Sequence, residues 1–335
     1  MLNVKRKTLL KKGSKTMNFF VAGRDNLALT IYVPYDCPND CPFCTSKKEY
    51  AFVKGNVKQV LAQMDDVFKN HNFPIKDVVI TGGEPTANID ILKQIFRNIP
   101  SQYHVYINTT LLDKNFEDFY EFVLDNRFNL CGVNVSRHAA SYEEELKMLH
   151  GIANDDKIEE LAKITSVRIN CVAPTIDNYK DITARWENRG VEVSFRADYT
   201  TIKTKLDLTT PYAEFPLELA KNYKYVSSGG CNVCHTMIFT TENNMTIRYH
   251  RGKEKTMIVR HDEVEYNDII IFQNGRLALD WKKDDETMLY TALAKRFYTR
   301  SVSVAKPSRS YPRESCGGSS CGGRRWQYSC GGSGC

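Results

Sequence analysis

The chain has 335 residues, of which 42% are hydrophobic and 26% are charged. These values are typical of about two folded domains, or of one α/β barrel with an appendage, and they exclude a wholly disordered protein. The net charge of +6 is unevenly placed, because segments 1–17 and 300–335 carry +6 and +5 and leave the middle at −5. A mildly acidic body does not fit a nucleic-acid-binding domain, whose basic residues form a patch on the fold, although the basic ends could contact an acidic partner or RNA.

No segment predicts membrane insertion or secretion. The longest apolar runs have the length of a strand, well short of the roughly 18 residues that a membrane helix needs. The basic segment 1–17 has only Leu9 and Leu10 as its apolar part, which is too short for a secretory signal. We therefore expect a cytoplasmic protein, in which eleven cysteines indicate metal binding or catalysis more than disulfides.

Strand-like and helix-like segments alternate along the first 200 residues. We predict strands over residues 28–33, 77–81, 103–108, 130–135, 166–172 and 191–196. Helical periodicity lies between them, over residues 56–71, 88–99, 115–127, 143–163 (broken near Gly151) and 177–189. Several strands are apolar with little alternation, which is typical of a sheet covered on both faces. Six such units predict an α/β fold, a partial (β/α)6 TIM-type barrel.

The pattern changes after residue 200. Segment 209–225 is rich in turn residues and has room for at most one short helix. We predict one hairpin over 236–249 around Glu242-Asn243-Asn244, a second over 268–281 around Asn274-Gly275, and a closing helix over 284–298. The chain is therefore divided into a basic N-terminal lead (1–24), the barrel (25–205), a small β-rich C-terminal module (206–299) and a flexible basic tail (300–335).

The tail has an unusual composition. Its last twenty residues hold seven of the 19 glycines of the chain and four cysteines, Cys316, Cys321, Cys330 and Cys335. Such a segment has almost nothing to bury and is expected to be disordered alone. Three interpretations stay open: extra metal or cluster ligands, a fused substrate whose Cys-Gly-Gly repeats resemble the core of a ribosomally made peptide, or an extension without a function.

Three cysteines follow the first predicted strand of the barrel. Cys37, Cys41 and Cys44 form a C-x3-C-x-aromatic-C motif, with Phe43 as the aromatic residue. Three thiolates in one loop can hold three irons of a four-iron cluster and leave the fourth iron open for a ligand. A structural zinc site is the alternative, but it normally has four ligands, and no fourth candidate lies nearby in the sequence.

A glycine pair follows the second predicted strand. The segment Gly82-Gly83-Glu84-Pro85 lies at the carboxyl end of that strand, where the chemistry of α/β barrels is done. Two glycines let the backbone approach a ligand closely, and a neighbouring carboxylate can receive an ammonium group. Taken alone, such a turn is a weak signal, but its position after the cysteine loop makes it specific.

Together the two motifs resemble those of the radical S-adenosylmethionine (SAM) superfamily, over about residues 25–200. The resemblance implies that Cys37, Cys41 and Cys44 bind a [4Fe-4S] cluster whose open iron chelates SAM. It implies that Phe43 packs near the adenine and that the segment from Gly82 to Pro85 binds the methionine amino group. Reductive cleavage of SAM would then give a 5′-deoxyadenosyl radical that abstracts a substrate hydrogen, with a reductant such as flavodoxin or ferredoxin as partner.

Further polar residues lie at the ends of the later strands. Ser136 and Arg137 resemble the pair that often meets the carboxylate and ribose of SAM, Asn170 and Arg196 resemble SAM contacts, and His138 could face the substrate. Each could instead be structural. Cys131 and Cys171 lie in apolar strands, where cysteine behaves as a small hydrophobic residue, and we predict both in the core.

A second cysteine pair, Cys231 and Cys234, opens the C-terminal module and is followed by His235. C-x2-C is half of a metal-binding motif. Many members of the superfamily carry auxiliary iron–sulfur clusters after the barrel, but the spacing here departs from the seven-cysteine pattern of the large auxiliary domain. The pair either shares a second cluster with other ligands or has only a local role.

We expect an enzyme that modifies a peptide or protein, because the tail resembles a peptide core and the module could hold an extended chain against a sheet edge. A small metabolite or nucleoside is the alternative substrate, since the fold does not determine it. A glycyl-radical activase would share both motifs. The alternative without catalysis is an iron–sulfur redox scaffold, against which the glycine–glutamate segment argues.

Overall fold

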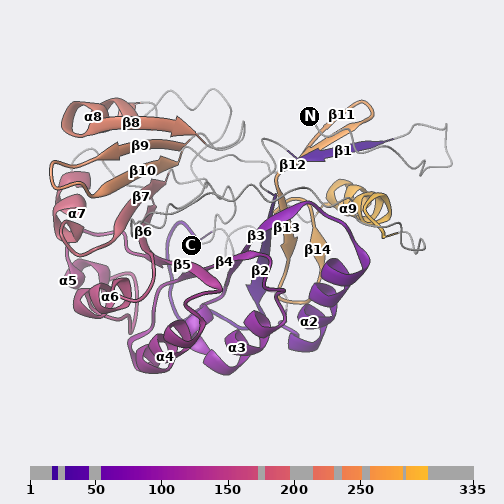
Figure 1. Cartoon of the computed structure of the whole chain (residues 1–335), viewed down its shortest axis with the longest axis horizontal. Coiled ribbons are helices and arrows are strands. Elements are labelled where there is room, and N and C mark those ends of the chain that lie inside the picture. The colour runs from indigo at the N-terminus through magenta and orange to yellow at the C-terminus, as the bar shows by residue number, and fades with distance from the viewer. Residues whose placement is uncertain are drawn as a thin grey trace, which may run out of the picture.

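The computed structural model (Figure 1) describes residues 17–21, 27–44, 54–172, 178–196, 214–229, 236–250, 257–281 and 284–300. Within these ranges, none of the helices combines the length and the apolar character that crossing a membrane requires. The predicted disorder of the tail falls on residues outside the described ranges, as does most of the predicted lead.

Six parallel strands form the centre of the fold, in the order in which they occur in the chain. They are β2 (Leu27–Val33), β3 (Ile75–Gly82), β4 (His104–Thr109), β5 (Leu130–Ser136), β6 (Val167–Val172) and β7 (Glu192–Arg196). Each pairs in parallel with the next along the sheet. The prediction of a partial α/β barrel is therefore confirmed, and the strand order of the described sheet does not close on itself.

Helices connect these strands and lie along the outside of the curved sheet (Figure 1). They are α2 (Val57–Asp65, continued by the π-helical turn Asp66–Asn70), α3 (Ile89–Arg97), α4 (Phe116–Asn126), α5 (Tyr142–Glu145), α6 (Asp155–Ala162) and α7 (Tyr179–Trp186). Asparagine side chains cap three of them, with Asn56, Asn88 and Asn154 each accepting a hydrogen bond from the first turn. The predicted break near Gly151 is confirmed, because this glycine has φ +60° between α5 and α6.

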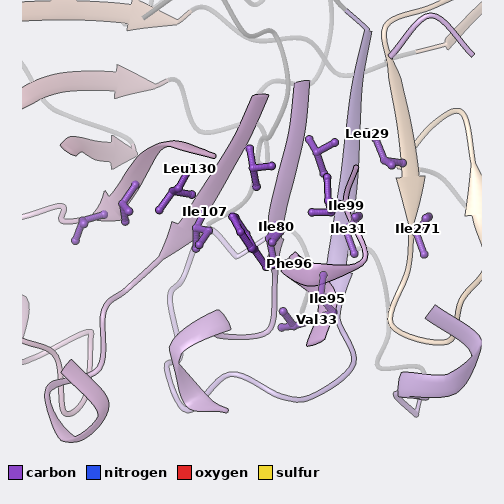
Figure 2. Close-up of a cluster of buried hydrophobic side chains, with 14 of the residues drawn as sticks. Leu29, Ile31, Val33, Ile80, Ile95, Phe96, Ile99, Ile107, Leu130 and Ile271 are labelled. Atoms are coloured by element: carbon purple, nitrogen blue, oxygen red, sulfur yellow. The ribbon is translucent and has the colours of Figure 1, made fainter. Parts of the chain in front are cut away.

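The outer face of the sheet carries the hydrophobic core. Alternate residues of the strands, such as Leu29, Ile31 and Ile80, pack with Ile95 and Phe96 of α3 in one cluster of buried side chains, which Figure 2 shows from the strands to the helix. Burial of each large aliphatic or aromatic side chain contributes about 1.5–3 kcal/mol to this layer.

The inner face of the same strands is polar although it is equally buried. In β5, β6 and β7 it carries Asn134, Ser136, Asn170, Ser194 and Arg196, all at most 9% exposed. The strands therefore alternate more than we predicted, because only one of their two faces packs against helices while the other encloses polar groups.

Strands that follow residue 200 extend both edges of the sheet. At one edge β13 (Asp268–Ile271) pairs in parallel with β2 and in antiparallel with β14 (Leu277–Ala278). At the other edge β10 (Thr246–His250) pairs in parallel with β7 and is followed by β9 (Thr236–Thr240) and β8 (Lys224–Gly229). The sheet thus has eleven described strands, of which five come from the predicted C-terminal module.

Both predicted hairpins are confirmed, with Asn244 at φ +64° and Gly275 at φ +78° in their turns. Helix α8 (Glu214–Asn222) is the single short helix expected there, and α9 (Asp285–Phe297) closes the described chain behind its N-cap Asp284. Strand β1 (Asn18–Val21) pairs with β12 (Glu263–Tyr266), which pairs with β11 (Met257–Arg260) in a second sheet. Strands of the predicted barrel and of the predicted C-terminal module thus share one sheet. The division of the chain into domains stays a prediction.

Candidate functional site

The predicted site residues that the structure describes lie mainly at one edge of the parallel sheet. The cysteine loop follows β2, the glycine pair ends β3 and begins the loop after it, and Ser136 to His138 follow the same line at β5. Asn170 and Arg196 lie near the ends of β6 and β7. Because all these strands are parallel, their carboxyl ends form a common edge, which is where α/β barrels place their chemistry.

The cysteine loop is folded tightly against the barrel. Cys41 and Cys44 are buried and joined by a turn in which Cys44 N–H donates to Cys41 O at 3.1 Å, while Cys37 is half-buried. Cys37 Sγ accepts a hydrogen bond from Asn39 N–H at 3.4 Å. Phe43, Cys41 and Cys44 pack with Leu149 and Ile152 in a separate apolar cluster.

The donor set of this loop fits an iron–sulfur cluster. Three cysteines in one loop supply thiolates, and an N–H···S contact of the kind made by Asn39 tunes such clusters. Within the described residues, no three His, Cys, Asp or Glu side chains converge as they do around one metal ion. A four-iron cluster does not need that convergence, because each of its thiolates binds a different iron.

The glycine pair touches the cysteine loop directly. A Cβ added at Gly83 would lie 2.0 Å from the carbonyl oxygen of Tyr35, so only glycine permits this approach. Gly82 has φ +93°, and a side chain there would overlap Tyr32. Tyr35 Oη donates to the carbonyl oxygen of Pro85 at 2.7 Å, which fixes the two loops to each other.

The Glu84 carboxylate lies inside the protein and accepts five hydrogen bonds. Thr86 N–H and Thr86 Oγ1 donate to Oε1 at 2.9 and 2.7 Å, and Thr109 Oγ1 donates to the same oxygen. Thr110 N–H and Thr110 Oγ1 donate to Oε2 at 2.7 and 2.6 Å. A carboxylate offers about four lone-pair positions. The five donors therefore occupy the Glu84 carboxylate, which we expected from the sequence to receive an ammonium group.

Thr110 connects the three motifs. Its hydroxyl donates to Glu84 and accepts from Asn39 Nδ2 at 2.9 Å, and its carbonyl oxygen accepts from Arg137 Nη1 at 2.7 Å. Asn39 lies between Cys37 and Cys41, and its Oδ1 accepts from His150 N–H at 2.6 Å. The glycine–glutamate segment, the cysteine loop and the end of β5 are therefore held in place by one residue.

Arg137 is fully buried and directs its Nη atoms at the main chain. Nη1 donates to the carbonyl oxygens of Thr110 and Ser136, and Nη2 donates to that of Ala153, each at 2.7 Å. Burial lowers the pKa of Arg137 to about 10, so it stays cationic at neutral pH, with the nearby Glu145 carboxylate acting in the opposite direction. Through these contacts Arg137 holds together the segments that contain Thr110, Ser136 and Ala153.

Three neighbouring side chains of the inner face differ from these, because they have no hydrogen-bond partners within the described residues. Ser136, Asn170 and Ser194 are paired in register across β5, β6 and β7, and they are 1%, 2% and 0% exposed. Neither Ser136 Oγ, nor Ser194 Oγ, nor either polar atom of the Asn170 amide has a hydrogen-bond partner in the part of the chain that the structure describes. Because buried polar groups normally find a partner, this row fits a polar ligand such as SAM.

Arg196 ends β7, opposite Val172 of β6 and His250 of β10. At the start of the same strand, Glu192 forms ion pairs with Arg168 at 3.3 Å and with Arg248 at 3.0 Å. Burial and these three arginines hold the pKa of His250 well below its usual value. The edge beyond β7 is thus rich in cations, a feature that alternation within β6, β7 and β10 could have predicted.

The remaining predictions have mixed outcomes. Cys171 lies in the core as expected, where burial raises the pKa of its thiol, whereas Cys131 is only half-buried. Cys231 and Cys234 lie outside the described residues, as do the tail cysteines. Asn39, Thr109 and Thr110 were not predicted as site residues, although the polar pair Thr109-Thr110 at the carboxyl end of β4 follows the same pattern as the other strand ends.

Comparisons with known proteins agree with this geometry. A family model described as the radical SAM superfamily matches residues 31–196, about half of the chain. The structure of SuiB from Streptococcus suis bound to the precursor peptide SuiA has TM-score 0.50 and 16% identity, with 82% of this chain and 64% of that chain covered. Thus the chain corresponds to just under two thirds of the length of SuiB.

Two further structures are less similar. The structure of anSMEcpe with bound AdoMet and Cp18Cys peptide has TM-score 0.43 and 15% identity, covering 75% of this chain and 73% of that chain. Methylornithine synthase (PylB) has TM-score 0.36 and 11% identity, covering 52% and 53%. No curated protein sequence matches the chain significantly. With its partial barrel, its cysteine loop and the match over residues 31–196, the chain belongs to the radical SAM superfamily of enzymes.

Proposed function

We propose that the chain binds a [4Fe-4S] cluster through Cys37, Cys41 and Cys44, binds SAM at the open iron, and uses them to modify a peptide or protein. The contact between the cysteine loop and Gly83 carries this proposal, because it brings the thiolate ligands and the glycine turn together at one edge. When bound and reduced, such a cluster would supply the electron for the reductive cleavage of SAM to methionine and a 5′-deoxyadenosyl radical.

The chain holds SAM along the carboxyl edge of the strands. Phe43 and the main chain from Gly82 to Pro85 face the cofactor beside the cysteine loop. Ser136 and Asn170 supply hydrogen bonds from the inner face, where their side chains have no partner within the described residues, and Arg196 supplies a cation. Burial of these groups keeps water from the radical.

Glu84 and Arg137 act on SAM indirectly in this proposal. The Glu84 carboxylate is bonded to Thr86, Thr109 and Thr110, and both Nη atoms of Arg137 are bonded to main-chain carbonyl oxygens. They therefore hold the cofactor-binding loops to each other, and the fully bonded Glu84 carboxylate needs no contact with SAM.

A peptide is the proposed substrate for two reasons. The Cys-Gly-Gly repeats of the tail resemble a peptide core, and the fold is shared with SuiB, which was solved with its precursor peptide. We propose that the enzyme acts in the cytoplasm, with a flavodoxin or ferredoxin as reductant. Mass spectrometry of the full chain after turnover tests whether its own tail is modified, and a tail of unchanged mass would leave only a separate substrate.

Cys231 and Cys234 are proposed ligands of an auxiliary iron–sulfur cluster. Two cysteines cannot complete a cluster, so His235, the tail or the substrate would supply the other ligands. About eight irons per chain would support this cluster, and about four would leave the pair without one.

The proposal is tested on protein purified without oxygen and reconstituted with iron and sulfide. With SAM and dithionite, we expect 5′-deoxyadenosine to form and to disappear when Cys37, Cys41 and Cys44 are replaced by alanine. Cys131→Ala is the matched control, because Cys131 lies outside the loop on β5. A cluster-loaded chain that binds SAM without cleaving it, with or without peptide, would instead indicate a redox scaffold.

A further inference from the structure

The polar inner face of the sheet continues beyond the barrel strands onto β10. Arg248 and His250 lie in register beside Ser194 and Arg196 of β7, and both side chains are buried. The apolar residues that alternate with them along β10 pack in the hydrophobic core on the outer face. Because β10 follows residue 200 in the chain, the predicted C-terminal module supplies part of the polar interior that the barrel strands enclose.

The cations on this face share a carboxylate. Glu192 Oε2 accepts from Arg168 Nε and Nη2, each at 3.3 Å, and from Arg248 Nε at 3.0 Å, while Oε1 accepts from Arg248 Nη2 at 3.2 Å. The three side chains thus carry two positive charges and one negative charge. Arg168 and Arg248 are 7% and 8% exposed, and a buried charge is costly unless an opposite charge compensates it. This set therefore favours a second anion.

His250 adds a polar atom that lacks a partner. Its Nδ1 and Thr236 Oγ1 on β9 lie 2.9 Å apart and share a hydrogen bond, whereas its Nε2 has no hydrogen-bond partner within the described residues. The two ring nitrogens point in diverging directions, so Nε2 is directed away from Thr236 and from β9. When the Thr236 hydroxyl donates to Nδ1, the neutral ring carries its hydrogen on Nε2 and can donate it to a ligand.

We propose that the inner face of β10 binds a carboxylate of the peptide substrate, with Arg248 and His250 as its contacts. This inference rests on the proposed function, which supplies the substrate class. A carboxylate suits the site because arginine offers charged, paired donors, and the bonds to Glu192 use only two of the five N–H groups of Arg248.

The substrate is a better source of this carboxylate than SAM. The contacts proposed for SAM all lie on or directly after the barrel strands β2 to β7, whereas β10 lies outside them. In the order of the sheet, five strands separate β10 from β2, which leads into the cysteine loop. We therefore assign the anion at β10 to the molecule that is modified.

Two substitutions with opposite expected effects separate this role from a structural one. Arg248→Gln removes one positive charge and leaves Arg168 to pair with Glu192, so carboxylate binding should weaken. Glu192→Gln removes the competing carboxylate, so carboxylate binding should tighten. An ion pair with a structural role alone would lower the stability of both variants without opposite changes in affinity. Arg189→Gln is the matched control, because Arg189 pairs with two carboxylates of α6.

The experiment follows the histidine ring signals of the cluster-loaded full chain, labelled with 15N-histidine, by NMR. The probes are N-acetylglutamate α-amide and its neutral counterpart N-acetylglutamine α-amide, each added with and without saturating S-adenosylhomocysteine. His250→Gln identifies the signals of His250. N-acetylglycine, compared with the first probe, distinguishes a C-terminal carboxylate from an acidic side chain.

We expect the carboxylate probe to shift the His250 signals saturably, with a Kd on the order of 1 mM, and the neutral probe to bind at least about tenfold more weakly. Arg248→Gln should weaken the carboxylate probe about tenfold, and Glu192→Gln should tighten it about threefold or more. Arg189→Gln and S-adenosylhomocysteine should leave its affinity unchanged.

Equal affinity for the charged and neutral probes would overturn the inference, and so would changes of the same sign in Arg248→Gln and Glu192→Gln. Displacement of the carboxylate probe by S-adenosylhomocysteine would assign the site to SAM and overturn the assignment to the substrate. The proposed function is tested separately by 5′-deoxyadenosine formation in the same sample. A sample that cleaves SAM but does not distinguish the probes overturns the inference alone.

Discussion

Two groups of buried polar side chains lie at the carboxyl edge of the sheet, and they are bonded in opposite ways. Around Thr110, every oxygen of the Glu84 carboxylate and both Nη atoms of Arg137 have protein partners. Across β5 to β7, the side chains of Ser136, Asn170 and Ser194 have none within the described residues.

In the proposed function, this difference separates residues that hold the loops together from residues that bind the cofactor. Buried groups that are bonded to one another fix loops, whereas buried groups that lack partners are costly unless a ligand supplies them. The Glu84 carboxylate and the Nη atoms of Arg137 belong to the first kind, although both residues lie in segments that the resemblance assigned to SAM, whereas Arg137 Nε has no partner within the described residues. In the proposed function, Glu84 thus serves the cofactor by shaping its site without touching it.

Removing the Glu84 carboxylate is expected to have the largest effect. In Glu84→Gln, either amide orientation sets an NH2 group against a main-chain N–H, of Thr86 or of Thr110. We expect the free energy of unfolding to fall by about 3 kcal/mol or more in denaturant titrations of the full chain. Glu117→Gln on the surface of α4 is the control, and a Glu84→Gln chain of normal stability would break the comparison.

Thr110→Val removes the hydroxyl between Glu84 and Asn39. We expect a loss of about 2 kcal/mol in unfolding free energy and fewer irons per reconstituted chain, because Asn39 of the cysteine loop loses its bond to the segment that follows β4. Thr183→Val deletes another buried hydroxyl, on α7. It should lower stability without changing iron content, and an equal loss of iron in both variants would contradict this role of Thr110.

The pKa of His138, lowered to about 3, predicts a dependence of stability on pH. Between the unfolded pKa near 6.5 and the folded value, only the unfolded chain binds this proton, so stability falls as the pH falls through that window. His138 contributes a slope of up to about 1.4 kcal/mol per pH unit. In denaturant titrations from pH 7 to pH 4, His138→Asn should show a shallower slope than the wild type, and equal slopes would argue against a buried neutral ring.

The smallest effects on stability are expected in the unpartnered row. Ser194→Ala should change unfolding free energy by less than about 0.5 kcal/mol while weakening S-adenosylhomocysteine binding about threefold to tenfold. Thr291→Val removes a buried hydroxyl of α9 that donates to the Thr287 carbonyl oxygen and accepts from Leu279 N–H, and it should show the reverse pattern. A Ser194→Ala chain that loses stability but keeps its affinity would place this residue in the framework.

Local sequence was enough to predict the six barrel strands, the two hairpins and most helices, because periodicity and turn residues act over a few positions, but β1, β8, β11 and β12 were not predicted. The partners of Glu84 were not predictable in that way, since Thr109 and Thr110 lie 25 and 26 residues away on the next strand. The polar alternation of Glu192, Ser194 and Arg196 along β7 was visible in the sequence. It was not used, because several of the predicted strands are mainly apolar. Nothing local indicated that β10 and β13 would join opposite edges of one sheet.

That attachment has a consequence for the order of folding during synthesis. When residues 27–196 have emerged from the ribosome, β2 and β7 are both edges with unpaired main-chain groups, because their outer neighbours follow later in the chain. Exposed edges of parallel sheets recruit other chains, so this interval is the one most prone to aggregation. A nascent chain halted before residue 246 should therefore depend on chaperones far more than one that has passed residue 271.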